Sequence, residues 1–505
     1  MNSERDSYRQ ILRSSSIMGG AAGLNYLIGL LRVKIVAMLL GPTGVGLLGL
    51  YISAMGFIGT VSGLGVGGSS VREVVLAFGR DDAVEAARTI RILRRACWAT
   101  GCLGWLSSAL LARPISLWLF GSTEQERAIA ILGVTLLLGA FATGRLALLQ
   151  GLRRIEDIAR ANVLGTLLGS VVAVAIYVVL GEAGVAPALV ATAAINAALS
   201  YWFSRRIAIS AVDLSWLETF VGLKRFVRLG VAFMWSAVLA AGLDALTRSV
   251  VASRYGIDSA GIYQAAWTLS GLFAGFILSA MGADYYPRLS AAIHDRAHAA
   301  RLVNEQMEVG VLLALPGLLA TLAFAPLIMI FFYTSRFLGA AELLPWMVLG
   351  VFGQVLSWPI GFIFLAKGAA RLVFIVETIF ALLQIGFLFF LVDRNGLPGA
   401  AQAFAATYAL HIPITLGIAR ALVGFRWSSS VTRLVVMASG CICASLIVST
   451  TTEGMTRVIA GGVVTLVGSI ISVRGLAARL GLENKLTGWM AMIPGGGIIL
   501  PKPKD

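Results

Sequence analysis

Two cations lie inside an apolar stretch that is long enough to cross a membrane. The stretch "NYLIGLLRVKIVAMLLGP", residues 25–42, contains Arg32 and Lys34. A cation in the middle of a bilayer costs about 2.5 to 3.5 kcal/mol on insertion scales, so it needs a partner or a function. Arg32 lies about 13.5 Å along a helix from Gly41 and shares a face with Asn25. This predicts either a buried ion pair with a carboxylate of another helix or an anion-binding site in a polar cavity.

Lys34 points in a different direction from Arg32. It lies about 200° around the helix and only about 10.5 Å from the outer end of the segment. Either its ammonium reaches the outer surface along the flexible side chain, or it faces the substrate path. We therefore treat Lys34, with Arg32 and Asn25, as a candidate substrate-binding residue.

Arg248 is a second intramembrane cation at almost the same depth, eight residues before Gly256. Asp244 precedes it by one helical turn, in the acid-first order that favours an ion pair. One interpretation is a pair that neutralises itself. In the other, Asp244 restrains Arg248 in a cleft or takes up a coupling proton. Arg248 is thus a candidate for substrate binding and Asp244 for ion coupling.

Two titratable residues lie inside later apolar segments. Glu377 is a lone carboxylate about two turns into its segment, and His411 lies in the middle of another. Each is either part of an ion-coupling site or a hydrogen-bonded packing group. His294 and His298 lack a third ligand, so no metal site is predicted.

Enzymatic chemistry is not indicated. The sequence contains no cluster of nucleophile, base and orienting residue, and no glycine motif that would cradle phosphate. No cofactor is expected. The four cysteines fall in apolar segments and give no disulfide framework.

The elements that carry these residues are transmembrane helices. A chain of 505 residues that is 58% hydrophobic and 13% charged cannot bury its apolar surface in one soluble core. We predict an all-α polytopic membrane protein of about fourteen helices. The predicted spans are 15–40, 46–70, 93–112, 128–150, 161–181, 185–204, 227–252, 261–286, 303–332, 343–366, 371–392, 397–420, 431–450 and 456–473.

The placement of cations predicts the topology. Most of the 40 Lys and Arg residues fall in the segments that face the cytoplasm if both termini are cytoplasmic. The outer loops contain only Arg113, Arg127, Arg254, Arg336, Arg394 and Arg457. The net charge of +15 is therefore topogenic and does not indicate nucleic-acid binding. We expect an inner-membrane protein.

The chain contains an internal repeat. The block that begins at Gly41 aligns with the block that begins at Gly256 without a gap, at an offset of 215 residues that pairs Gly46 with Gly261. An even number of spans separates the copies, so both face the same way, as in transporters with two six-helix lobes around a central cavity. The predicted parts are listed here: an N-lobe at 1–215, a C-lobe at 216–424, two extra helices at 425–475 and a cytoplasmic tail at 476–505. The extra helices are either peripheral or form a lipid-facing groove.

Three blocks resemble a known family. "LLGPTGVGLLGLYISAMGFIGTVSGLGVGGSSVREV", "LAKGAARLVFIVE" and "GLPGAAQAFAATYAL" are similar to blocks of Wzx-type polysaccharide flippases, which belong to the multidrug/oligosaccharidyl-lipid/polysaccharide exporter superfamily. The similarity spans roughly residues 15–424. Lys34 and Arg32 match first-helix cations of such flippases, and Lys367, Arg371 and Glu377 also fall on matching positions. The two extra helices and the tail exceed the twelve-helix pattern.

The resemblance implies a function in surface polysaccharide synthesis. It implies a transporter that flips an undecaprenyl-diphosphate-linked oligosaccharide from the cytoplasmic to the periplasmic leaflet, driven by an ion gradient or by exchange. Arg32 and Arg248 would hold the diphosphate while the lipid tail stays between the lobes. Membrane lipids, a polysaccharide polymerase and glycosyltransferases are candidate partners, and a monomer is the expected functional unit.

Three other functions remain as alternatives. A multidrug or cation extruder of the same superfamily should carry more cavity carboxylates than cations, whereas the predicted midplane shows the reverse. A membrane glycan polymerase or ligase should carry a sizeable outer loop, and the outer loops here are short. A non-transporting assembly scaffold is the third.

Overall fold

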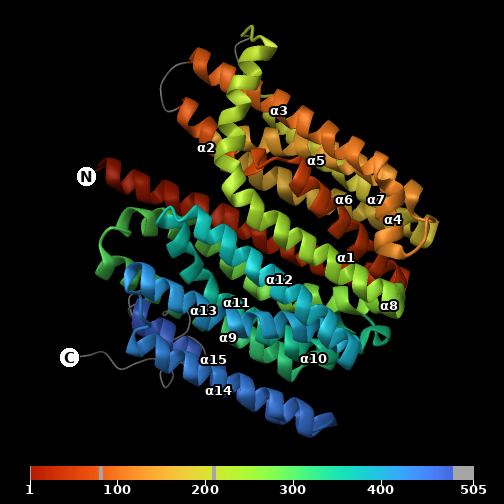
Figure 1. Ribbon diagram of the computed structural model, residues 1–505, viewed down its shortest axis with the longest axis vertical. Helices are drawn as coiled ribbons and strands as arrows, with labels where there is room; N and C mark the ends of the chain where they lie inside the picture. Colours follow the sequence, from red (N-terminus) through yellow and green to blue (C-terminus); the bar gives the residue numbers. More distant parts are fainter. Residues whose placement is uncertain (1, 79–82, 208–211, 481–505) are drawn as a thin grey trace. The chain divides into compact units, whose positions relative to one another are not determined.

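The described chain is built from helices. The computed structural model describes residues 2–78, 83–207 and 212–480 (Figure 1). The helices of the first part are α1 (Asn2–Ser62), α2 (Val66–Phe78), α3 (Ala83–Leu110), α4 (Ala112–Phe120), α5 (Glu126–Gly151), α6 (Ile155–Leu180), η1 (Gly181–Gly184), α7 (Val185–Ser204) and α8 (Trp216–Ala292). They are followed by α9 (Arg296–Ala323), α10 (Ala325–Phe332), η2 (Ser335–Phe337), α11 (Ala340–Ala366), α12 (Ala370–Asn395), α13 (Pro398–Val423), α14 (Ser429–Thr451) and α15 (Gly454–Leu480). The predicted all-α class is confirmed.

Two of the long helices are bent at repeat-equivalent glycines. Gly41 in α1 has φ 63° and Gly256 in α8 has φ 85°, a region of backbone space that is open to glycine. Pro42 follows Gly41 and removes a helical hydrogen-bond donor. Each bend separates two of the predicted spans, so α1 and α8 each contain two.

The described residues contain 9 helices that are long and apolar enough to cross a membrane, or up to 10 if the bent pair α3 and α4 is one span. One of the nine, Ile155–Ser204, joins α6 and α7, and another holds both halves of α1 beyond Gly19. The chain is therefore a multi-pass membrane protein. The count of fourteen stays a prediction.

The chain forms two compact units. Unit 1 comprises residues 1–264 and 332–336, and unit 2 comprises 265–331 and 337–505. In unit 1, α5 packs against α3 and α7, and α1 packs against α6. Glycines allow these helices to approach closely: a Cβ on Gly133 would lie 2.9 Å from Ser108, and one on Gly144 would lie 2.8 Å from the Cys97 sulfur.

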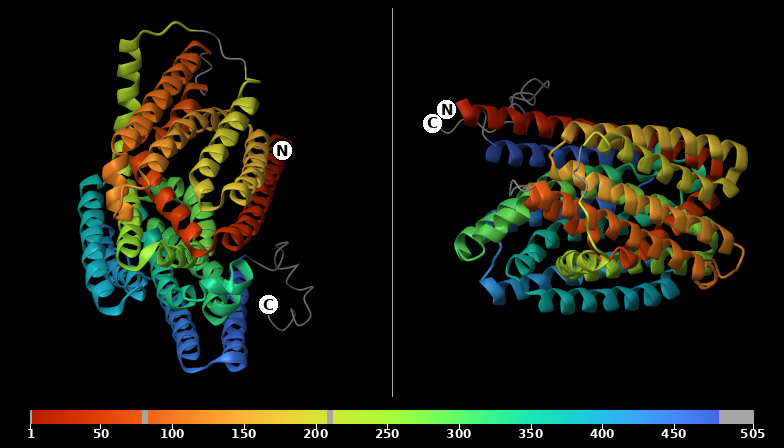
Figure 2. Two further views of the ribbon diagram at one scale, coloured as in Figure 1. Left: turned by 90° about the vertical axis from the view of Figure 1, so that its right-hand side faces the viewer. Right: turned by 90° about the horizontal axis from the view of Figure 1, so that it is seen from above.

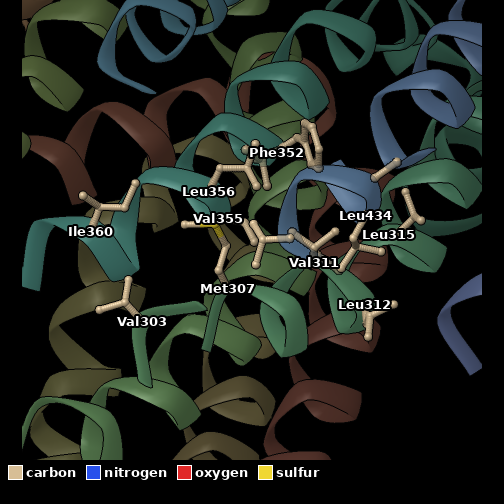
Figure 3. Packing of buried hydrophobic residues seen from close by; sticks show 14 of the residues in the cluster. Val303, Met307, Val311, Leu312, Leu315, Phe352, Val355, Leu356, Ile360 and Leu434 are labelled. Carbon is tan, nitrogen blue, oxygen red and sulfur yellow. The ribbon is translucent and has the colours of Figure 1, made fainter. Parts of the chain in front are cut away.

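Unit 2 has an apolar core between α9, α11, α13 and α14. Val303, Met307 and Val311 of α9 face Val355 and other residues of α11 (Figure 3). Most members of this cluster are almost completely buried. The packing of α11 on α13 uses a glycine again, because a Cβ on Gly350 would meet the Phe404 ring at 2.1 Å.

The last two helices pack on unit 2 through α9. α14 and α15 form a pair joined by a short turn (Figure 2). Gly461, Gly468 and Gly475 of α15 follow one another at seven-residue spacing, and Cβ atoms on them would lie 2.7, 2.2 and 2.7 Å from side chains of α9. At its end, Arg479 donates to Glu308 of α9 at 2.5 Å. These extra helices are therefore built onto the outside of α9.

The repeat extends well beyond the block seen in the sequence. Arg153 and Gly368, which are 215 residues apart, both have positive φ, of 54° and 71°. Each is followed by the same turn hydrogen bond, Arg154 N to Leu149 O in one repeat and Ala369 N to Phe364 O in the other. Gly181 and Gly396 close the next helix in the same way. One constant offset thus relates the two halves.

Candidate functional site

Three pairs of repeat-equivalent residues lie face to face where α1 meets α8. Thr43 Oγ1 donates to Asp258 Oδ1 at 2.6 Å. A Cβ on Gly46 would lie 3.0 Å from Gly261 N, and a Cβ on Gly261 would lie 1.9 Å from Pro42 O. One turn further along, a Cβ on Gly49 would lie 2.6 Å from Gln264 Oε1. Both members of each pair belong to unit 1.

This contact defines the local symmetry. Equivalent residues of two helices meet repeatedly only when the helices run parallel about a twofold axis between them. The three pairs recur every three residues, which is one face of a helix. We call this contact, formed by residues 43, 46 and 49 with 258, 261 and 264, the axial seam. It agrees with the prediction that the repeats are parallel.

Arg248 is buried beside the axial seam. Its side chain is 5% exposed, whereas that of Asp244 is 33% exposed. Arg248 forms an ion pair with Asp244, donates from Nη1 to the Asp244 carbonyl oxygen at 3.2 Å and donates from Nε to Gln264 Oε1 at 2.7 Å. The structure thus brings Asp244 and Arg248 together as an intrahelical pair, supported by a residue of the axial seam.

Arg32 and Arg248 do not occupy equivalent positions. At an offset of 215 residues, Arg248 corresponds to Val33, and Arg32 corresponds to Thr247. One residue along a helix is a rotation of about 100°, so the two cations leave their helices on different faces. The near match in depth noted in the sequence does not extend to direction.

Lys34 takes part in a symmetric pair of contacts. Its Nζ donates to the carbonyl oxygen of Tyr333, and Ser249 Oγ donates to the carbonyl oxygen of Trp118 at 2.6 Å. Ser249 is the repeat equivalent of Lys34, and Tyr333 is that of Trp118. Each contact therefore fastens a first helix of one repeat to the segment after a third helix of the other.

Arg32 is the least engaged of the candidate cations. It is partly exposed and makes no hydrogen bond or ion pair with another residue in the described part of the chain. It lies close enough to Tyr177 of α6 for an electrostatic interaction. On the same face of α1, Asn25 Oδ1 is buried and has no partner among the described residues. This face combines a cation with an unsatisfied amide oxygen.

Glu377 and His411 lie in unit 2, on the adjacent helices α12 and α13. The His411 ring packs 4.2 Å from Phe380 and 5.5 Å from Tyr408, centroid to centroid. Its Nδ1 is buried without a partner among the described residues. Glu377 interacts electrostatically with Tyr408. The described residues contain no group of three or more His, Cys, Asp or Glu that could hold a metal ion.

Gln264, Ser249 and the carbonyl oxygens of Trp118 and Tyr333 were not recognised from the sequence. Their signal was present in the 215-residue offset, which pairs Gln264 with Gly49 and Ser249 with Lys34. What the sequence did not supply is the position of the seam between the copies.

Comparison with known proteins gives the family. A family model described as "Polysaccharide biosynthesis protein" matches residues 11–293, more than half of the chain. The chain is 25% identical to the lipid III flippase of Escherichia coli strain K12 over 405 residues, which cover 77% of this chain and 93% of that protein. The lipid III flippase of Shigella flexneri matches equally.

Solved structures show the same fold. The lipid II flippase MurJ in an inward closed conformation has a TM-score of 0.67 at 15% identity, covering 91% of this chain and 99% of that one. A multidrug resistance MATE family transporter of the MOP superfamily, in an inward-facing conformation, has a TM-score of 0.62 at 19% identity, covering 82% and 96%. These relatives are flippases and transporters, not enzymes. The chain thus belongs to the polysaccharide biosynthesis protein family and has the fold of MOP superfamily transporters.

Proposed function

We propose that the protein flips an undecaprenyl-diphosphate-linked oligosaccharide from the cytoplasmic to the periplasmic leaflet of a bacterial inner membrane, for the synthesis of a surface polysaccharide. The observation that carries this proposal is the 25% identity to a lipid III flippase along 93% of its length. The transport cycle is alternating access between two lobes, 1–215 and 216–424, with both termini in the cytoplasm. A polymerase and glycosyltransferases consume and supply the substrate.

Arg32 is the proposed contact for the diphosphate. An anionic head group cannot cross hydrocarbon without a counter-charge, and a guanidinium binds phosphate oxygens with two parallel hydrogen bonds. Arg32 is partly exposed at mid-membrane depth, and the unsatisfied Asn25 amide lies two turns away on the same face. An amide side chain is suited to a sugar hydroxyl or a bridging phosphate oxygen.

Arg248 and Lys34 are proposed to join the substrate site at another stage of the cycle. In the described conformation Arg248 is held by Asp244 and Gln264, and Lys34 by the Tyr333 carbonyl oxygen. Separation of the axial seam removes Gln264 from its place against Gly49. That step frees one donor of Arg248 for the diphosphate.

Ion coupling is assigned to Glu377 and His411, with Asp244 as a third candidate. The first repeat carries Asn162 and Asn196 at the positions equivalent to Glu377 and His411. Both asparagines are neutral at every physiological pH, so only the second repeat can take up a proton at this place. The asymmetry supports a coupling role for Glu377 and His411.

A multidrug extruder is the competing function, because MATE transporters share the fold. The charge of the first helix separates the two functions. Arg32 and Lys34 repel the cationic drugs that a cation extruder carries and attract a diphosphate.

A genetic assay tests the proposal. A strain that lacks this gene is complemented with the wild type, Arg32→Ala or Arg32→Lys, and surface polysaccharide is measured together with the amount of protein in the membrane. We expect Arg32→Ala to abolish export at normal protein abundance and Arg32→Lys to retain part of it. Full export by Arg32→Ala would overturn the assigned role of Arg32, and absence of export by the wild type would overturn the function.

A further inference from the structure

A group of strongly exposed apolar side chains lies at the start of α8. Trp216, Leu217, Phe220 and Val221 are 65%, 76%, 64% and 68% exposed. Their spacing places them on one face of the helix. We call these four residues the α8 patch. No other described residue covers this face, so its physiological environment must supply the cover.

The start of α8 is fixed by local hydrogen bonds. Ser215 N donates to Glu218 Oε2 at 2.8 Å, and Glu218 N donates to Ser215 Oγ at 3.1 Å. This reciprocal pair is a capping box, which satisfies two free backbone donors at a helix N-terminus. The patch is therefore part of a defined helix and not of a frayed end.

Three arginines of α3 hold this helix in place. Arg88 pairs with Glu218 at 3.3 Å, and Arg91 pairs with Asp213 at 3.7 Å. Arg95 donates to Ser215 O at 3.2 Å and to Thr219 Oγ1 at 2.6 Å. The Arg95 guanidinium also lies 4.5 Å from the centre of the Trp216 ring. The arginines thus form the rim of the α8 patch.

The opposite face of the helix packs on α3. Thr219 is buried, and a Cβ on Gly222 would lie 2.5 Å from Ile92. Leu223 packs against the buried cluster of α2, α3 and α5. Because one face is committed to α3, the α8 patch cannot turn inward, and its orientation is set by the fold (Figure 1).

The α8 patch lies at the depth of lipid head groups. Trp216 precedes the predicted span at 227–252 by eleven residues, about 16 Å of helix. Glu218, whose side chain is 47% exposed, lies between the apolar side chains, as does Arg88 at 45%. Charged groups exposed to that extent exclude the hydrocarbon core, whereas the interface accepts both kinds of side chain.

We propose that the α8 patch docks on the inner leaflet and binds anionic phospholipid. Trp216 is the residue type that prefers the membrane interface. Arg88, Arg91 and Arg95 outnumber the two carboxylates that pair with them, so the rim carries a net positive charge that matches an anionic leaflet. Docking fixes the depth of the α3–α8 contact relative to the bilayer. The inference is independent of the transported substrate.

Site-directed spin labelling tests the proposal. The label is placed by Leu217→Cys in a full-length variant that carries alanine in place of Cys97, Cys102, Cys441 and Cys443. The protein is studied in nanodiscs of phosphatidylcholine, with and without phosphatidylglycerol. Collisions with oxygen report lipid, and collisions with a nickel chelate report water. We expect phosphatidylglycerol to raise the ratio of oxygen to nickel collisions, by about fivefold for one arginine that engages a head group.

Controls distinguish this surface from the rest of the membrane boundary. A label at Leu110, which is 80% exposed at the other end of α3, should give the same ratio in both lipid mixtures. Phe220→Ser with Val221→Ser should lower the ratio at position 217, whereas Leu110→Ser with Leu111→Ser should not.

Native mass spectrometry of the unlabelled wild type provides a second measurement. The protein should retain phosphatidylglycerol in preference to phosphatidylcholine. A label at position 217 that stays open to the nickel chelate in both mixtures would contradict docking and leave a protein partner as the cover. Equal burial in both mixtures, or equal retention of the two lipids, would contradict the anionic preference.

Discussion

Thr43 and Asp258 occupy the same position in the two repeats and are hydrogen-bonded to each other, with 2.6 Å between Thr43 Oγ1 and Asp258 Oδ1. Gly46 and Gly261 are the next such pair, and their backbones touch. A pair of identical glycines on a twofold axis allows the closest approach of two helices. The axial seam is therefore a contact that any added side chain must separate.

Gly261→Ala should destabilise the protein. Its Cβ would lie 1.9 Å from Pro42 O, a backbone atom that cannot rotate away. Overpacking of this kind costs about 1 to 3 kcal/mol. Thermal unfolding in detergent should show a lower midpoint for Gly261→Ala. Gly56→Ala is the matched control, because nothing lies within 4 Å of that added Cβ. Equal stability of Gly261→Ala and wild type would argue against the seam.

Asp244→Asn should also lower stability, because it leaves the buried Arg248 guanidinium without its counter-charge. Loss of one partner of a fully buried pair costs about 3 to 5 kcal/mol. Asp244 is about one third exposed, so we expect about 2 kcal/mol. Asp244→Asn combined with Arg248→Met should recover most of the loss in the same unfolding assay. Additive losses in the double variant would show that the two residues are not coupled.

Gly468→Leu should detach α15 from α9 while leaving the twelve preceding spans folded. The added Cβ alone would lie 2.2 Å from Leu319 Cδ1. Limited proteolysis should cleave between α14 and α15 in this variant. Gly440→Leu on α14 is the control, since open space surrounds that glycine. If α14 and α15 are peripheral, polysaccharide export persists in Gly468→Leu; its loss would show that these helices take part in transport.

Asp295 should stabilise α9 in a pH-dependent manner. Its carboxylate accepts hydrogen bonds from the backbone N–H groups of His298 and Ala297, and the bond from His298 is the main reason why its pKa lies below the ordinary value of 3.8. A lowered pKa contributes stability above 3.8 that disappears as the pH falls through the folded value. The midpoint difference between wild type and Asp295→Ala should therefore be constant from neutral pH down to about 5 and shrink in stronger acid. Asp295→Asn keeps a cap without the charge, so a pH-dependent difference between Asp295→Asn and Asp295→Ala would contradict this account.

Apolar length, glycine spacing and cation placement were enough to predict the helical class and the repeat. The bend at Gly41 and its copy at Gly256 follow from residues visible in the sequence, because a glycine followed by a proline interrupts a helix. The alignment of Gly46 with Gly261 likewise follows from the offset of 215 residues.

Side-chain partners could not be predicted in the same way. The spacing of Asp244 and Arg248 correctly offered an ion pair, but nothing local to Arg248 reveals that Gln264, from a later helix, completes it. The depth of Arg248 suggested equivalence to Arg32, and a shift of one residue turns the two cations to different faces. Contacts between segments distant in the chain depend on helix rotation, which hydropathy does not define.

The most direct measurement is transport by the purified protein in liposomes that contain a fluorescent undecaprenyl-diphosphate-linked oligosaccharide in both leaflets. Access of the oligosaccharide to an external glycosidase reports flipping. We predict that the wild type lets the glycosidase digest nearly all of the lipid, whereas Arg32→Ala leaves the inner half protected. Protection of the inner half with the wild type in the presence of an ion gradient would contradict the account.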